Sequence, residues 1–247
     1  MSRARLAFAL ALGLALLTLP AAASAGPPFL TDDPAPTDFK HWEIYAPLFT
    51  AAGSGKEFDG WLGAEINYGA APDLQLTLDL PAAFAHDAGG AQWGAGDVAA
   101  SVKYRFYHDE AAGLQIAAFP AVTLPTASHG LGAGRVTAFL PVWAQKDMGP
   151  WSVFGGGGYA VNPGSGNRDY WTGGVALTRQ VSEGLLVGVE ADRQGPDTVG
   201  GRASTSLGLG GIVDLKGPLR LLASGGPTWT DGGGRGFHAF AALGLDF

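Results

Sequence analysis

Apolar and polar residues alternate with a period of two along most of the chain after residue 39. In 74–80 four leucines alternate with glutamine, threonine and aspartate, and 98–106 and 237–247 repeat the pattern. Successive side chains of a β-strand point to opposite faces of the sheet, so this period predicts strands with one apolar and one polar face. Turn sequences such as 71–73 and 148–150 separate the runs.

Twelve such strands are predicted. Their expected bounds are 39–51, 58–70, 73–85, 97–108, 113–125, 135–147, 150–162, 169–181, 184–195, 202–215, 218–229 and 236–247. The connections after even-numbered strands are tight, whereas those after odd-numbered strands tend to be longer and richer in glycine. An even strand number, short turns on one side and longer loops on the other are typical of outer-membrane barrels. We therefore predict an all-β fold, a transmembrane antiparallel β-barrel.

A soluble β-sandwich is the competing interpretation, because it also alternates at period two. The predicted strands are long enough for the about 9–11 residues that a tilted strand needs to cross a bilayer, whereas ordinary strands average about 5–6 residues. Aromatic residues gather near strand ends, with Trp42 and Trp151 on the turn side and Trp171 and Trp229 on the loop side. Two aromatic belts match the two membrane interfaces, so the barrel is favoured.

Composition fits a wall that faces lipid. Only 15% of the 247 residues are charged, and the chain has 40 glycines and no cysteine. An average domain has roughly 25% charged residues and 7% glycine. The net charge of −7 argues against nucleic acid as a partner. The partners we expect are outer-membrane lipid and a small-molecule solute, and no oligomeric state is predicted.

The chain is predicted to have three parts. Residues 1–25 have the features of a cleaved signal peptide, with two arginines, a 14-residue apolar stretch and a small-residue cleavage site. Residues 26–38 contain four prolines and three aspartates without alternation. They form either a plug folded into the lumen or a disordered periplasmic leader. The barrel then spans 39–247, which indicates the bacterial outer membrane as the location.

The final strand ends at Phe247, after apolar residues at every second position. This ending is similar to the sorting signal that the outer-membrane insertion machinery reads in bacterial barrel proteins. That machinery is therefore a further expected partner, which would act through Phe247.

The polar face of each strand provides candidate lumen-lining residues, since the apolar face of a membrane barrel contacts lipid. The charged candidates are Glu43, Glu65, Asp79, Lys103, Arg105, Glu190, Asp192 and Arg220. Most lie toward the periplasmic end, where mixed signs fit a salt-bridge network better than a substrate-binding ring. Glu190 and Asp192 lie higher in the lumen and are expected to pair with Arg168 or Arg202 of the loops, or else to attract a cation.

Two prolines fall at nearly the same height on neighbouring predicted strands, Pro120 and Pro141. Proline lacks the N–H that a ladder needs. The pair indicates either two harmless bulges, the favoured interpretation, or a kink in the wall through which an apolar solute leaves sideways into lipid. Twelve strands lie between the roughly eight of a filled barrel and the 16–18 of an open channel, so the lumen should be narrow or plugged.

No catalytic, cofactor-binding or metal-binding residue is predicted. The five histidines belong to no nucleophile motif. There is no cysteine, His-x-x-x-His pair or EF-hand loop. We therefore do not expect an enzyme, and a barrel lipid hydrolase is a distant third interpretation.

Short motifs carry a resemblance to a known family. They are Phe-Leu-Thr-Asp-Asp-Pro at 29–34, Gly-Ala-Gly-Asp-Val at 94–98 before Lys-Tyr at 103–104, and Leu-Pro-Thr at 124–126 followed by Gly-Leu-Gly at 130–132. On these residues the chain resembles the outer-membrane barrels of the phenol-degradation meta-pathway (MetA-pathway) transporter family, although Ala127 stands where the pattern has glycine. The resemblance covers most of the mature chain and implies uptake of small aromatic or hydrophobic compounds, with no established substrate residues. The alternative is a structural or surface-interaction barrel without transport; the short loops favour transport.

Overall fold

The computed structural model describes residues 28–128 and 130–247, so the predicted signal peptide at 1–25 lies outside the described residues. In the described part, no helix has the length and hydropathy needed to span a membrane. The strand segments there are β1 Trp42–Ser54, β2 Glu57–Ala71, β3 Leu74–Asp87, β4 Gly90–Ala95, β5 Val98–Asp109, β6 Leu114–Ala118, β7 Ala121–Leu124, β8 Thr137–Met148, β9 Trp151–Val161, β10 Tyr170–Ser182, β11 Leu185–Gln194, β12 Ser204–Asp214, β13 Leu219–Thr230 and β14 Gly234–Asp246.

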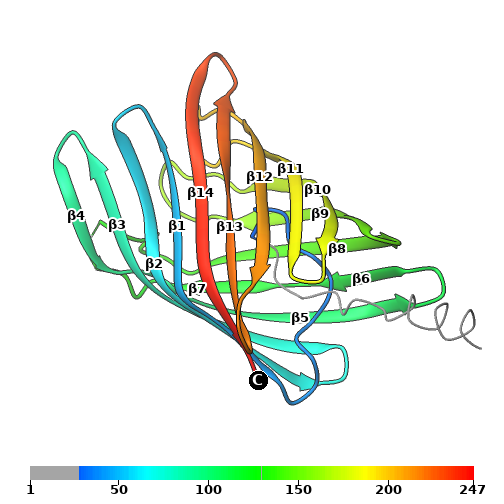
Figure 1. Ribbon diagram of the computed structural model, residues 1–247. Coiled ribbons are helices and arrows are strands. Elements are labelled where there is room, and N and C mark those ends of the chain that lie inside the picture. The colour runs from blue at the N-terminus through cyan, green and yellow to red at the C-terminus, as the bar shows by residue number, and fades with distance from the viewer. Residues whose placement is uncertain (1–27, 129) are drawn as a thin grey trace, which may run out of the picture.

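These segments make a closed barrel (Figure 1). β4 and β5 together form one barrel strand, since both pair with β3, and β6 and β7 form another between β5 and β8. All neighbouring strands are antiparallel, and β1 pairs with β14. The described residues therefore form an antiparallel barrel of twelve strands, which confirms the predicted fold class.

The seam between the first and last strands is closed by backbone hydrogen bonds at the turn end. Trp42 and Phe247 exchange two of them, at 2.7 and 3.0 Å. The Phe247 side chain is 58% exposed on the outer surface. The last residue therefore belongs to the ladder that closes the wall.

One predicted loop is in fact strand. Residues 86–96 extend the β3–β4 hairpin, in which Asp87 pairs with Gly90. The four glycines at 89, 90, 94 and 96 interrupt the alternation, which is why the sequence pattern indicated a loop. The longest connection among the described residues is instead 125–136, between β7 and β8.

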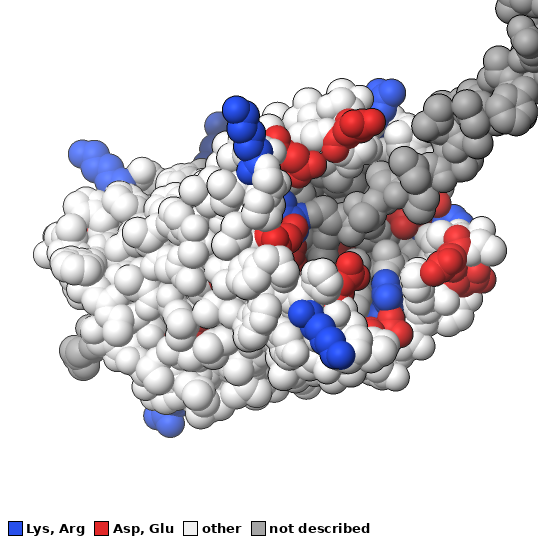
Figure 2. Space-filling model, turned by 60° about the horizontal axis from the view of Figure 1, so that its bottom comes forward, with Lys and Arg blue, Asp and Glu red and all other residues white. Residues whose placement is uncertain are grey.

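The apolar face of the strands points outward. On β3, Leu76, Leu78 and Leu80 are exposed, whereas Gln75 and Thr77 between them are buried. Figure 2 shows an outer wall almost without charge, and acidic and basic side chains around the open end of the barrel. This distribution is the one that lipid outside and a polar lumen inside require.

An irregularity in β1 directs additional apolar side chains inward. The register shifts between Tyr45 and Leu48 on both sides of the strand. A bulge changes which side chains face each side of a sheet, and both residues are buried. They pack with Ile212, Leu222 and Ala242 into a cluster inside the barrel. The lumen is therefore partly filled by apolar side chains on the β1, β12, β13 and β14 side.

Candidate functional site

The segment before the barrel, residues 28–38, lies among lumen-facing side chains. Pro28, Thr31 and Pro34 are fully buried, and Thr37 is 7% exposed. The segment contains no strand, so its buried backbone N–H groups need partners outside a ladder. Side chains of the barrel wall bind the segment at three places, and at two of them they accept hydrogen bonds from its backbone N–H groups.

The first anchor is Glu190 on β11, which is 4% exposed. Its carboxylate oxygens accept hydrogen bonds from the backbone N–H groups of Leu30, at 3.1 Å, and Thr31, at 3.0 Å. Nε2 of His238 on β14 lies 3.7 Å from Oε1 of the same carboxylate. One wall carboxylate thus holds two consecutive backbone groups of the segment.

The second anchor is Lys103 on β5, which is 2% exposed. Its ammonium lies 3.1 Å from Oδ1 of Asp32 and 3.8 Å from Oδ1 of Asp33. It also donates a hydrogen bond to the carbonyl oxygen of Ala35 at 3.4 Å. A buried charge is stable only when it is paired, so the segment and Lys103 depend on each other.

The third anchor lies closer to the turn end. Oε1 of Gln75 accepts hydrogen bonds from the backbone N–H of Thr37, at 2.7 Å, and from its hydroxyl, at 3.0 Å. Near the start of the segment, Phe29 packs directly against the wall. A Cβ at Gly188 would lie 2.8 Å from its ring and one at Gly210 would lie 3.0 Å away. These glycines permit the close approach of the segment to β11 and β12.

The sequence interpretation of Glu190 is wrong in its choice of partner. It favoured Arg168 or Arg202, but residues 28–38 occupy the space beside Glu190, and Arg202 instead donates to the carbonyl oxygen of Asp231 at 3.0 Å. Asp192 is half-buried two residues further along the same strand. It takes part in none of the ion pairs found in the described residues.

A separate charge cluster lies at the turn end of the lumen. Arg220 on β13 contacts Oε1 of Glu43 at 2.6 Å and also pairs with Asp246. The side chains of Arg220 and Glu43 are each 6% exposed. Arg105 is not part of this cluster, because it pairs with Asp73 of the β2–β3 turn at 2.6 Å. The mixed charges therefore lie in separate groups and not in one ring.

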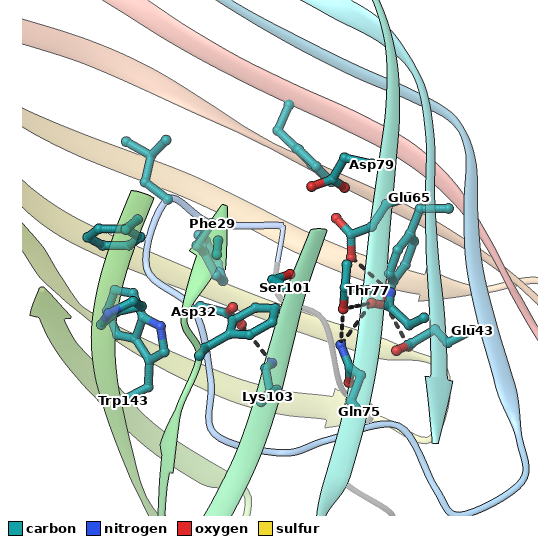
Figure 3. Close-up of a pocket in the computed structure, with 18 of the residues that line it drawn as sticks. Phe29, Asp32, Glu43, Glu65, Gln75, Thr77, Asp79, Ser101, Lys103 and Trp143 are labelled. Atoms are coloured by element: carbon teal, nitrogen blue, oxygen red, sulfur yellow. Dashed lines mark hydrogen bonds and ion pairs between the residues drawn. The ribbon is translucent and has the colours of Figure 1, made fainter. Parts of the chain in front are cut away.

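A cavity of about 290 Å³ lies between residues 28–38 and the wall (Figure 3). Its polar side carries carboxylates and neutral hydrogen-bonding groups, and its other side is aromatic and aliphatic. The polar lining is Asp32, Glu43, Glu65, Asn67, Gln75, Thr77, Asp79, Ser101 and Lys103. The apolar lining includes Phe29, Tyr45, Phe119, Phe139, Trp143, Leu222 and Phe240. A cavity of about 150 Å³ can hold benzene, so this one accommodates a substituted single ring.

Two buried polar atoms on the side chains that line this cavity have no hydrogen-bond partner. They are Oδ1 of Asp79 and the indole N–H of Trp143, a side chain only 4% exposed. Glu65, directly opposite Asp79 on the neighbouring strand, accepts one hydrogen bond from Asn67 at 2.9 Å. Buried polar groups without partners are rare in folded proteins, so the cavity offers one acceptor and one donor to an occupant.

The regular strand pairing is interrupted beside the two prolines, although backbone hydrogen bonds still cross the break. Residues 119–120 separate β6 from β7, and Pro141 lies in β8 beside this break. Val102 donates to the carbonyl oxygen of Pro120 at 3.0 Å, and Phe119 donates to that of Pro141 at 3.1 Å. Neither proline can donate in return, because proline has no N–H. The side chain of Pro120 is exposed and that of Pro141 is buried.

The aromatic lining was missed by the sequence interpretation, which considered only polar residues on the inward face. Phe139, Pro141 and Trp143 share the parity of Gln145 on β8, so the alternation alone could have placed them in the lumen. The contacts of residues 28–38 have no comparable signal, because that segment does not alternate.

No protein-family model matches the chain, and no curated protein has a significantly similar sequence. Solved structures do share the fold. The COG4313 outer membrane channel from Pseudomonas putida F1 has a TM-score of 0.66 and 14% identity over 91% of this chain and 100% of that chain. The NanC porin has a TM-score of 0.56 and 7% identity, covering 82% and 98%. The translocator domain of autotransporter NalP from Neisseria meningitidis has a TM-score of 0.54 and 13% identity, covering 85% and 89%.

At these identities the likeness defines a class of fold. The chain is an outer-membrane β-barrel, and the expected location in a bacterial outer membrane is confirmed. Channels, a porin and an autotransporter translocator share this architecture. Any preference of this barrel for a solute depends on the side chains that line its own lumen.

Proposed function

We propose that the protein is a channel that carries small aromatic or hydrophobic solutes across the outer membrane, with residues 28–38 as a plug in its lumen. The observation that carries the proposal is the 290 Å³ cavity inside the barrel, with an aromatic side and unpartnered polar atoms. A barrel that served only as a structural element would gain stability from filling this space.

The plug limits which solutes pass. Its anchors at Glu190, Lys103 and Gln75 are hydrogen bonds and ion pairs, which can exchange with water when the segment moves. A solute of one ring fits beside the segment in the cavity, whereas a larger solute requires the segment to leave. Passage of larger molecules therefore depends on movement of residues 28–38.

The test is flux and single-channel conductance of the purified protein in liposomes, with uncharged aromatic compounds, alkanes and sugars compared. We expect small aromatic or hydrophobic solutes to enter faster than into protein-free liposomes, and sugars to enter slowly. Deletion of residues 28–38 should raise the conductance, since it removes the segment that fills the lumen. Heat-modifiable migration on a gel shows whether the deletion variant folds.

Two results would count against the proposal. An unchanged conductance after the deletion would contradict the proposal that residues 28–38 plug the lumen. No flux of any solute, in the full protein or in a folded deletion variant, would favour the structural or surface-interaction barrel.

A further inference from the structure

The cavity has more acidic groups than it can pair internally. Four carboxylates line it, those of Asp32, Glu43, Glu65 and Asp79, and Lys103 is the one Lys or Arg among its described lining residues. Asp32 pairs with Lys103, and Glu43 pairs with Arg220 from outside the cavity. The other two carboxylates take part in no ion pair found in the described residues.

These two remaining acids face each other. Glu65 on β2 and Asp79 on β3 are direct cross-strand partners, and like charges in such a pair destabilise a sheet. Asn67 donates one hydrogen bond to Glu65, whereas the buried Oδ1 of Asp79 accepts none. A cation placed between the two carboxylates would remove the repulsion and supply the missing donor.

The rest of the cavity fits the body of an organic cation. Phe139 and Phe240 contribute aromatic surface, and the ring of Phe119 already has the Lys103 ammonium 4.7 Å from its centroid. Aromatic faces attract cations, most strongly where water is excluded. The unpartnered indole N–H of Trp143, on a side chain 4% exposed, needs an acceptor. That donor is independent of the acidic pair and needs an oxygen or nitrogen acceptor on the occupant.

We propose that this cavity selects small aromatic amines that also carry a hydrogen-bond acceptor. The ammonium binds between Glu65 and Asp79, the ring lies against Phe139 and Phe240, and the acceptor receives the Trp143 N–H. The inference rests on the proposed function in taking the lumen as the solute path. Among the aromatic solutes of the proposed function it disfavours acids, because a carboxylate would be repelled by this acidic lining.

Binding to the purified protein in detergent tests the inference without requiring transport. Isothermal titration calorimetry at neutral pH, corrected for protein-free micelles, compares benzylamine, benzyl alcohol and benzoate, which have nearly equal size. We expect benzylamine to bind at least about tenfold tighter than benzyl alcohol, as a charge-assisted hydrogen bond allows, and benzoate to bind more weakly than both. Equal affinities, tighter binding of benzoate, or no binding of any of the three would overturn the proposal.

Variants locate the ammonium site. Asp79→Asn and Glu65→Gln each keep the shape of the side chain. Each should weaken the binding of benzylamine by about tenfold and leave the affinity for benzyl alcohol nearly unchanged. Asp59→Asn is the matched control, because Asp59 lies on the same strand as Glu65, at the same parity, and does not line the cavity. The assignment would be contradicted if the control variant lost amine binding, or if both cavity variants bound the amine as tightly as the wild type. Heat-modifiable migration verifies that each variant is folded.

A ligand pair tests the indole donor. 4-Methoxybenzylamine adds an acceptor to benzylamine, and its affinity should exceed that of benzylamine in the wild type. The ratio of the two affinities should fall to about one in Trp143→Phe, because a ring without the N–H cannot donate. A ratio unaffected by the substitution would exclude Trp143 from the site.

The outcomes separate this inference from the proposed function. If amines bind, and the variants change this binding as expected, but no solute crosses the liposome membrane, then the binding site is supported and the channel function is contradicted. If solutes cross the membrane without any preference for amines, then the channel function is supported and the proposed selectivity is contradicted.

Discussion

At the residue scale, the lumen combines buried charges that have partners with buried polar atoms that lack them. Arg220 and Glu43 stabilise each other at the turn end, and Lys103 pairs with two aspartates of the N-terminal segment. Among the four acids that line the cavity, only Glu65 and Asp79 form no ion pair with the described residues. The paired groups hold the structure, and the unpaired ones are available to a solute.

Arg220→Met tests the claim that the paired buried charges stabilise the structure. The substitution leaves Glu43 buried without its cation, and breaking a buried pair costs about 3–5 kcal/mol. The free energy of unfolding, measured with urea in lipid vesicles, should fall by that amount. Met keeps the unbranched apolar stem of the Arg220 side chain, so the substitution mainly removes the charged guanidinium and its contacts.

Arg193→Met is the matched control at the outer rim. Arg193 pairs with Asp231 at 2.6 Å, but both side chains are more than half exposed. The hydrogen bond from Arg193 lowers the pKa of Asp231, so this contact exists at neutral pH and weakens as the pH falls through that lowered pKa. Exposed pairs contribute little, and the control should unfold like the wild type. A similar decrease of the free energy of unfolding in both variants would contradict the claim that the buried pair contributes more stability than the exposed one.

At the element scale, alternation predicted the strands well but failed where the backbone is irregular. The outward leucines of β3 and the inward Lys103 of β5 follow from parity alone. The hairpin at 86–96 could not be predicted from parity, because its glycines interrupt the alternation of apolar and polar residues. The bulge after Tyr45 also escaped prediction, since an extra residue in one strand changes parity without changing composition.

The proline break is the element whose function is still a proposal. We propose that the interruption at Pro120 and Pro141 lets apolar solutes leave the lumen toward lipid. The double variant Pro120→Ala/Pro141→Ala restores two N–H donors that face Val102 and Phe119 across the ladder. Transfer of an apolar fluorophore from the lumen into the bilayer should slow, while ion conductance stays the same.

Pro227→Ala is the control for that experiment, because Pro227 lies on β13, paired with Phe237 of β14 and on strands other than those of the break at residues 119–120. It should leave the transfer rate unchanged. Equal transfer in the wild type and the double variant would mean that the two prolines are tolerated irregularities without a role in exit.

At the scale of the whole molecule, strand number, closure and location could be predicted because they depend on a pattern repeated along more than 200 residues. The path of residues 28–38 could not be chosen from sequence, because a segment rich in proline and aspartate suits a plug and a disordered leader equally. Its placement depends on long-range partners such as Glu190 and Gln75, far away in the chain. Such contacts leave no local pattern.

The central claim is that solutes pass through this lumen and that residues 28–38 control their passage. A Cβ at Gly174 on β10 would lie 2.4 Å from Oγ1 of Thr31 and 2.8 Å from the carbonyl oxygen of Ala191. Cysteines at both positions are therefore close enough to cross-link the segment to the wall, and heat-modifiable migration of the Gly174→Cys single variant verifies that the wall accepts the new side chain. The native chain has no cysteine, which makes the double variant Thr31→Cys/Gly174→Cys specific. Each single variant serves as a control.

The most direct measurement is the conductance and solute flux of that double variant in liposomes, before and after reduction. For solutes larger than a single ring, we expect low flux when the variant is oxidised, and recovery on reduction to the level of the single variants. Equal flux in the oxidised and reduced protein would contradict the claim that movement of residues 28–38 opens the lumen.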